Sequence, residues 1–139
     1  MIMLAALSAG IIACTAPTVH DGDTLRCGKT SLRLFGVDAP EVRRGKAPAE
    51  PLAYEARDLL QSLTRGRVGC RVVDEDRYHR QVARCWSSAS PDLNAAMIRS
   101  GLATEWRAYS KGAYAAIQDE AKAAGRGAWA PGAAPRKAR

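Results

Sequence analysis

Four cysteines in a chain of 139 residues are the feature that most limits its fold, because their spacing fits short cross-links. Cys70 and Cys85 flank two β-rich runs, residues 71–74 and 81–86, which the polar segment 76–79 joins. A hairpin turn centred on the middle of that segment places Cys70 directly opposite Cys85. Their Cβ atoms would then lie about 4.5–5.5 Å apart, near disulfide range. The sequence therefore predicts an antiparallel hairpin closed by a Cys70–Cys85 bond.

Cys14 and Cys27 are then the two cysteines left over, and we expect them to pair with each other. A hairpin turn centred on Asp21-Gly22 would not place them opposite each other, because it misses that register by two positions. Each bond would close a loop of about 15 residues and contribute about 3 kcal/mol. Two disulfides predict an oxidising compartment. Two alternatives stay open: four buried free thiols in a cytosolic protein, or a lipid on Cys14, whose flanking residues resemble a lipoprotein cleavage box. No CxxC occurs, and with two histidines the chain lacks a credible zinc set.

The two ends of the chain differ from its middle in composition. The first 19 residues contain no charged side chain, and residues 1–13 are almost entirely apolar, as in a secretory signal. Residues 1–17 are therefore expected to be a leader or the approach to a first strand, and export to the periplasm or medium is favoured over a buried first strand. No apolar run reaches the roughly 18 residues of a membrane span. Residues 131–139 are expected to form a mobile basic tail after a domain over residues 18–130.

The charge balance indicates a class of partner. Lys and Arg number 21 against 14 Asp and Glu, a formal net charge of +7, while 47% of residues are hydrophobic. That hydrophobic fraction excludes a wholly disordered chain, and the positive charge favours polyanions.

Strands and helices follow one another in an order typical of an α+β protein. Hydrophobic patterning predicts strands followed by a helix, a β-hairpin and two final helices, organised around a small antiparallel sheet or barrel. The predicted strands cover residues 25–27, 31–37, 71–74 and 81–86, and the predicted helices cover 51–64, 92–99 and 113–124.

Three segments place charges where packing disfavours them: DGDT at 21–24, LRLFGVDAPE at 32–41 and DRYHR at 76–80. A strand that is apolar on both faces should be buried, yet Arg33 lies at its centre. A buried guanidinium requires an anion, which can be a carboxylate or a phosphate.

These charges match the needs of phosphodiester hydrolysis. Asp23 and Asp38 offer hard oxygen ligands that suit Ca²⁺ or Mg²⁺. Arginines suit the charge that spreads over phosphate oxygens during attack, and Glu41 could orient or deprotonate water. The alternative is a network of structural ion pairs.

The motifs VHDGDTLRC (19–27), LRLFGVDAPE (32–41) and DRYHRQVARCW (76–86) strongly resemble the staphylococcal nuclease family, in family order. Weaker matches are DLNAAMIRSGLA (92–103) and EAKAAGRGAWA (120–130). The resemblance implies a five-stranded OB-fold barrel with three helices. It also implies a Ca²⁺-dependent nuclease that acts on DNA and RNA. A monomer with no stable protein partner is expected.

The resemblance also implies roles for individual residues. Asp23 and Asp38 would be carboxylate ligands of Ca²⁺, with the Ala39 carbonyl as a further ligand where staphylococcal members have Thr. Glu41 matches the proposed general base.

Further positions would contact the substrate. Arg33 and Arg80 match the two phosphate-binding arginines, and Tyr78 matches the aromatic beside the nucleotide phosphate. His79 replaces the Gly commonly found there, which bears on how Arg80 is placed. Trp106, Tyr109 and Lys111 fall where the family places residues that border the base pocket; rim packing is the alternative role.

A second class of function remains open, a non-catalytic nucleic-acid-binding module that keeps the fold. The presence of all five matched charged residues favours the enzyme.

Overall fold

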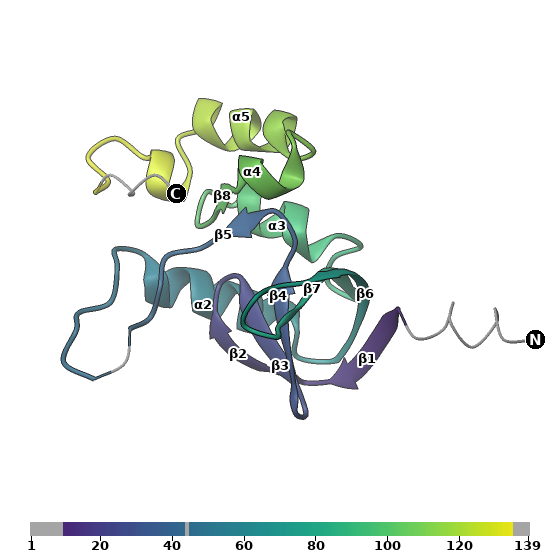
Figure 1. The fold of residues 1–139 in the computed structure, drawn as a ribbon. Helices are drawn as coiled ribbons and strands as arrows, with labels where there is room; N and C mark the ends of the chain where they lie inside the picture. The colour runs from purple at the N-terminus through teal and green to yellow at the C-terminus, as the bar shows by residue number, and fades with distance from the viewer. Residues whose placement is uncertain (1–9, 44, 135–139) are drawn as a thin grey trace, which may run out of the picture.

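A computed structural model describes residues 10–43 and 45–134 and confirms an α+β fold built on a curled, mainly β structure (Figure 1). One six-stranded sheet has the order β1-β6-β7-β4-β3-β2. Its strands are β1 (Ile11–Thr15), β2 (Thr18–Asp21), β3 (Thr24–Cys27), β4 (Thr30–Leu34), β6 (Arg67–Glu75) and β7 (Gln81–Ser87). The β4–β7 pair is parallel and the other pairs are antiparallel. Because β1 and β2 follow each other in the chain yet lie at opposite edges of this order, the sheet curls toward a barrel.

The counts differ from the expected five strands and three helices. The predicted strand 31–37 is interrupted at Gly36, which has a φ of 71°. After this break β5 (Val37–Asp38) pairs with β8 (Thr104–Glu105) in a separate two-stranded sheet. A short extra helix also occurs. The α-helices of the described residues are α2 (Ala53–Leu63), α3 (Leu93–Arg99), α4 (Arg107–Ser110) and α5 (Ala115–Ala123), followed by the 3₁₀ helix η1 (Gly127–Trp129).

The core lies inside the curled sheet and under the helices. The three predicted helices agree with α2, α3 and α5 to within two residues at each end. Helix α2 buries Ala56 and Leu60 against the sheet. Alternate residues of the strands and the inner face of α3 complete the core; the largest of them include Leu25, Leu32, Leu34, Val68, Leu93, Met97 and Ile98.

The β6–β7 hairpin has the predicted register at its cysteines, since Cys70 lies opposite Cys85 and the two are disulfide-bonded. The register then shifts by one residue between Val72 and Asp74, through a β-bulge. The turn is consequently centred on Tyr78 rather than between residues 77 and 78.

The second disulfide joins Cys14 to Cys27, as expected. The two-position misfit disappears because β1 does not extend the β2–β3 hairpin but pairs with β6. The bond therefore connects β1 to β3, two strands separated in the sheet order. No described cysteine is free, which disagrees with the free-thiol alternative and leaves no thiol on Cys14 for a lipid.

The predicted leader and tail are only partly described. Residues 1–9 of the leader and 135–139 of the tail lie outside the described residues, whereas Ile11–Thr15 form β1. Among residues 10–43 and 45–134, no helix is long and apolar enough to cross a membrane.

Candidate active site

Arg33 lies near the end of β4 with 8% of its surface exposed. Its Nη2 atom is 3.3 Å from Oδ2 of Asp23 and donates a hydrogen bond to the Val37 carbonyl at 3.2 Å. The guanidinium also lies 4.9 Å from the centroid of the Trp106 ring. The predicted need for an anion is thus met by Asp23. A guanidinium carries five N–H groups, so these contacts leave donors for a ligand.

Asp23 is held at the β2–β3 turn, where 3% of its surface is exposed. Its Oδ1 accepts a hydrogen bond from the Thr24 hydroxyl, and its Oδ2 accepts one from the backbone N–H of Ala39. The carboxylate therefore ties the DGDT turn to the segment that follows β5. An ionised carboxylate has about four acceptor sites, so these bonds do not exhaust its capacity.

Asp38 and Ala39 are also buried, with 4% and 1% of their surfaces exposed. The Asp38 backbone carbonyl accepts a long hydrogen bond from the Thr104 hydroxyl at 3.4 Å, within the β5–β8 pair. Two buried aspartates beside a buried backbone segment supply the hard oxygen donors that Ca²⁺ prefers. Within the described residues no cluster of three or more His, Cys, Asp or Glu side chains could hold a metal, so carbonyl and water oxygens would have to complete such a site.

Asp21 is a further acid at this site that sequence reasoning did not assign, although it lies in the quoted DGDT motif. Its Oδ1 accepts a hydrogen bond from the backbone N–H of Val42 at 2.8 Å. Burial raises the pKa of the Asp21 carboxyl, the bond from Val42 opposes this, and the charges of Asp23 and Glu41 raise it further. The acids of the site therefore repel one another, which a bound cation would relieve.

Glu41 begins the loop that leads to α2 and is exposed. Its backbone N–H donates to the carboxylate of Glu50, and its carbonyl accepts from the Glu50 N–H. These two bonds hold the ends of the loop together. Glu41 lines a cleft of about 490 Å³ with Asp21 and Arg80.

The hairpin turn that carries Arg80 is organised by one carboxylate. Oδ1 of Asp76 accepts the backbone N–H groups of Tyr78 and Arg80, and its Oδ2 accepts Nε–H of Arg80 at 2.7 Å. Burial alone would raise the pKa of Asp76, but the hydrogen bonds and the positive charge of Arg80 hold it below its usual value. Asp76 thus aims the Arg80 guanidinium while leaving its Nη groups available.

His79 adopts a φ of 64°, in the left-handed region that glycine favours. The side chain is 90% exposed, and its Nδ1 lies 3.7 Å from Glu75. The turn therefore has the backbone form that a glycine would give, and Arg80 reaches the site.

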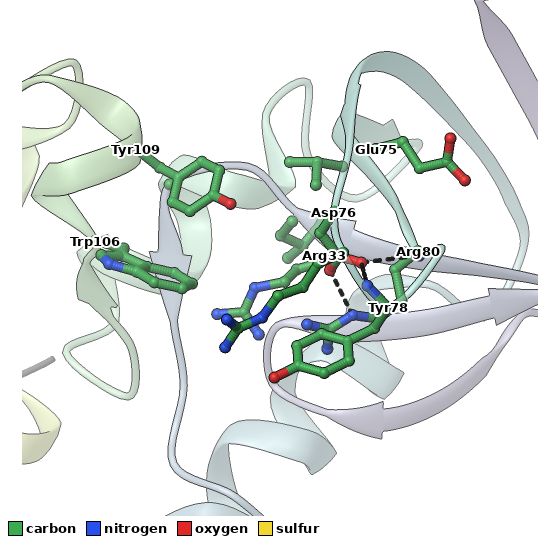
Figure 2. A pocket seen from close by; sticks show the side chains of 11 residues that line it. Arg33, Glu75, Asp76, Tyr78, Arg80, Trp106 and Tyr109 are labelled. Carbon is green, nitrogen blue, oxygen red and sulfur yellow. Dashed lines mark hydrogen bonds and ion pairs between the residues drawn. The ribbon is translucent and has the colours of Figure 1, made fainter.

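A second cavity, of about 320 Å³, lies between this turn and the C-terminal helices. Figure 2 shows Trp106 and Tyr109 on one side, Tyr78 and Arg80 on the other, and Arg33 between them. The Trp106 and Tyr109 rings meet edge to face at 4.7 Å, and Arg80 lies 5.4 Å from the Tyr78 ring centroid.

Arg80 lines both cavities. We call the cavity that Asp21 and Glu41 line the acidic cleft, and the cavity that Tyr78, Trp106 and Tyr109 line the aromatic pocket. Of the sequence-predicted residues, Arg33, Tyr78, Trp106 and Tyr109 line the pocket with Arg80, and Glu41 lines the cleft. Lys111 is exposed at the end of α4 and lines neither cavity.

The aromatic side of the pocket depends on Glu105, which sequence reasoning missed. Its Oε2 accepts hydrogen bonds from the Ser110 hydroxyl at 2.6 Å and the Tyr114 N–H at 2.8 Å. The backbone N–H of Trp106 donates a hydrogen bond to the Gly36 carbonyl at 2.7 Å. No local pattern in the sequence reveals this network, because its partners come from separate segments.

Comparisons with known proteins place the chain in a family. The family model described as staphylococcal nuclease homologue matches residues 31–131. The succinoglycan biosynthesis protein ExoI of Rhizobium meliloti is 34% identical over 81% of this chain, and the protein named Probable endonuclease LCL3 of Clavispora lusitaniae is 38% identical over 73%. The chain spans 62% and 48% of the lengths of these two relatives. Since the family model matches well over half of the residues, the chain belongs to the family of staphylococcal nuclease homologues.

Proposed function

We propose that the protein is a Ca²⁺-dependent nuclease that hydrolyses phosphodiester bonds of DNA and RNA with low sequence specificity. The observation that carries this proposal is the position of Arg80, which lines the acidic cleft with Glu41 and the aromatic pocket with Arg33. A phosphodiester beside Arg80 would have a carboxylate on one side and nucleotide-sized space on the other. Endonuclease names among the relatives support the same reaction class.

The residues that would hold Ca²⁺ are Asp23 and Asp38 through their carboxylates and Ala39 through its carbonyl. When bound, the ion would supply Lewis-acid polarisation of the phosphate and neutralise part of its charge. The buried carboxylates of Asp23 and Asp38 and the raised pKa of Asp21 support a cation here.

Arg33 and Arg80 would bind the non-bridging phosphate oxygens and stabilise the charge that develops as water attacks. Arg33 is already oriented by Asp23 and Val37, and Arg80 by Asp76, so little reorganisation is needed at the moment of reaction. Glu41 would orient the attacking water and accept its proton.

Low sequence specificity follows from the chemistry of the pocket walls. Tyr78, Trp106 and Tyr109 present aromatic surfaces, and every nucleobase has a face that stacks on them. Arginine contacts to phosphate carry no sequence information.

Export to an oxidising compartment is part of the proposal, because two disulfides persist where thiols are not kept reduced. We also propose that the protein acts as a monomer without a stable protein partner.

The test is an assay of plasmid DNA and of RNA with the purified protein in Ca²⁺ and in excess chelator. We expect fragmentation of both substrates in Ca²⁺, none in chelator, and a large loss in the Glu41→Gln variant. A matched control is Glu55→Gln, since Glu55 is exposed on the neighbouring helix α2 and lines neither cavity. Retardation of DNA on a gel without fragmentation in Ca²⁺ would identify a binding module instead.

A further inference from the structure

The outer face of the β6–β7 hairpin carries cations around an exposed tryptophan. Gly69 lies opposite Trp86, and Arg71 lies opposite Arg84 in the next outward-facing pair. Arg67 is two residues from Gly69 on the same side of β6. We call these five residues the outer platform. They alternate with the buried residues of the same strands, so their side chains face solvent rather than the core.

The Trp86 ring packs against the backbone of Gly69, which has no side chain. A Cβ atom on Gly69 would meet the Trp86 ring at 2.5 Å, so the indole lies directly against the glycine. Trp86 nevertheless keeps 36% of its surface exposed. Its ring also borders a groove of about 430 Å³ that Arg67 lines. The missing side chain at Gly69 therefore leaves space in which the Trp86 ring packs at the surface.

Within the part of the chain that the structure describes, none of the ion pairs involves Arg67, Arg71 or Arg84. Arg71 and Arg84 lie directly opposite each other, and like charges in that position of an antiparallel pair are expected to repel. Among these three described arginines only Arg84 lies near aromatic rings, with its guanidinium 4.9 Å from the Phe35 ring centroid and 5.9 Å from the Tyr114 ring centroid. A polyanion bound to the platform would offset the repulsion between Arg71 and Arg84.

We propose that the outer platform is a second binding site for single-stranded nucleic acid, with an unpaired base stacked on Trp86 and neighbouring phosphates on Arg67 and Arg71. An aromatic face flanked by arginines is the combination that binds single strands without reading their sequence. The inference rests on the proposed function, because its ligand is the part of a long substrate that extends beyond the cleavage pocket.

The platform and the pocket share one structural element. Arg80 immediately precedes β7, on which Trp86 lies six residues further along, a separation of about 20 Å along an extended chain. A short substrate at Arg80 therefore leaves the platform empty, whereas a long one can occupy both. The platform should raise affinity for long strands and leave the chemistry at Arg80 unchanged.

The first test measures binding without cleavage. An Arg80→Ala background in excess chelator is titrated against a fluorescent 20-nucleotide oligothymidylate, and anisotropy is followed. Adding Trp86→Ala should weaken binding about 5- to 150-fold, the range for loss of one stacked base. Tyr54→Ala is the matched control, since Tyr54 is 49% exposed on α2 and lies outside the platform. It should change binding less than twofold.

The second test removes charge rather than the ring. Arg67→Gln with Arg71→Gln should reduce the slope of log K against log salt by about 1.4, as expected for two lost phosphate contacts on a single strand. Arg26→Gln with Lys29→Gln, which removes two exposed cations in and just after β3, is the control for net charge alone. This pair of variants carries the test if Trp86→Ala lowers the melting temperature.

The third test uses the active enzyme and separates this inference from the proposed function. Trp86→Ala should raise KM for long single-stranded DNA and leave kcat/KM for a small phosphodiester, bis(p-nitrophenyl) phosphate, unchanged. If the wild-type protein cleaves neither substrate, the proposed function fails while the binding result still stands. Unchanged oligonucleotide binding in a folded Trp86→Ala protein would overturn the inference. So would preferential binding of an acidic polysaccharide such as alginate that requires Trp86.

Discussion

Arg33 and Arg80 line one pocket but are held in opposite ways. Arg33 is part of a barrel strand, 8% exposed, and paired with a buried aspartate from another turn. Arg80 lies beside a hairpin turn, with 27% of its side chain exposed, and is held by Asp76 four residues earlier. The fold as a whole therefore positions one arginine, and a local turn positions the other. Changes at Arg33 should affect folding and activity together, whereas changes at Arg80 should affect activity alone.

The largest effect is expected at Arg33. Arg33→Gln leaves the Asp23 carboxylate buried without its cation, which should lower the free energy of unfolding by about 3–5 kcal/mol. Urea denaturation in chelator measures this loss. A change below about 1 kcal/mol would mean that the Asp23–Arg33 pair is not integral to the fold.

Arg80→Gln should separate activity from stability. We expect kcat/KM for DNA to fall about 10²- to 10³-fold, the loss typical for a donor that stabilises transition-state charge. The free energy of unfolding should change by no more than about 1 kcal/mol, because the ion pair with Asp76 is partly exposed. A stability loss as large as that of Arg33→Gln would remove the contrast between the two arginines.

Asp76→Asn tests whether the charge of Asp76 stabilises the turn that positions Arg80. The pKa of Asp76 is lowered in the folded protein, so its charge contributes stability that is complete above the ordinary value of 3.8. That contribution is lost as pH falls through the lower folded pKa. Wild type should therefore exceed the variant by about 1–2 kcal/mol at pH 6, from the charge-assisted bonds, and the gap should narrow at acid pH. Thermal unfolding from pH 2 to 6 measures it, and a constant gap would contradict the assignment.

The smallest effect is expected at His79. Because His79 already adopts a left-handed backbone, His79→Gly should stabilise the protein by no more than about 1 kcal/mol and change kcat/KM less than twofold. A larger loss of activity would show that the imidazole contacts the substrate.

The same contrast, between features set by a local segment and features set by the whole fold, explains what could be predicted from the sequence. The Cys70–Cys85 register, the three main helices and the anion partner of Arg33 depend on local spacing or on burial, which the residues themselves reveal. The pairing of β1 with β6 and the bulge between Val72 and Asp74 depend on contacts between distant segments. Since β-sheet pairing is set by the whole barrel, the Cys14–Cys27 bond could be predicted only by remainder, and the turn at Asp21-Gly22 did not account for it.

The site divides in the same way. Motif positions located the acids and arginines, and the structure brings Glu41 and Arg80 to one cleft. Asp21 and Glu105 were missed because each acts through backbone N–H groups of residues far along the chain or in another element. Hydrogen bonds of this kind leave no periodic trace in a sequence.

The central claim is that Arg33 and Arg80 bind the same phosphodiester, and a double-mutant cycle on kcat/KM tests it most directly. Arg33→Lys and Arg80→Lys keep the charges but remove the planar fork that binds two phosphate oxygens. If both arginines act on one phosphate, the double variant should lose far less than the product of the two single losses. Losses that multiply independently would place the two side chains on separate ligands and contradict the account.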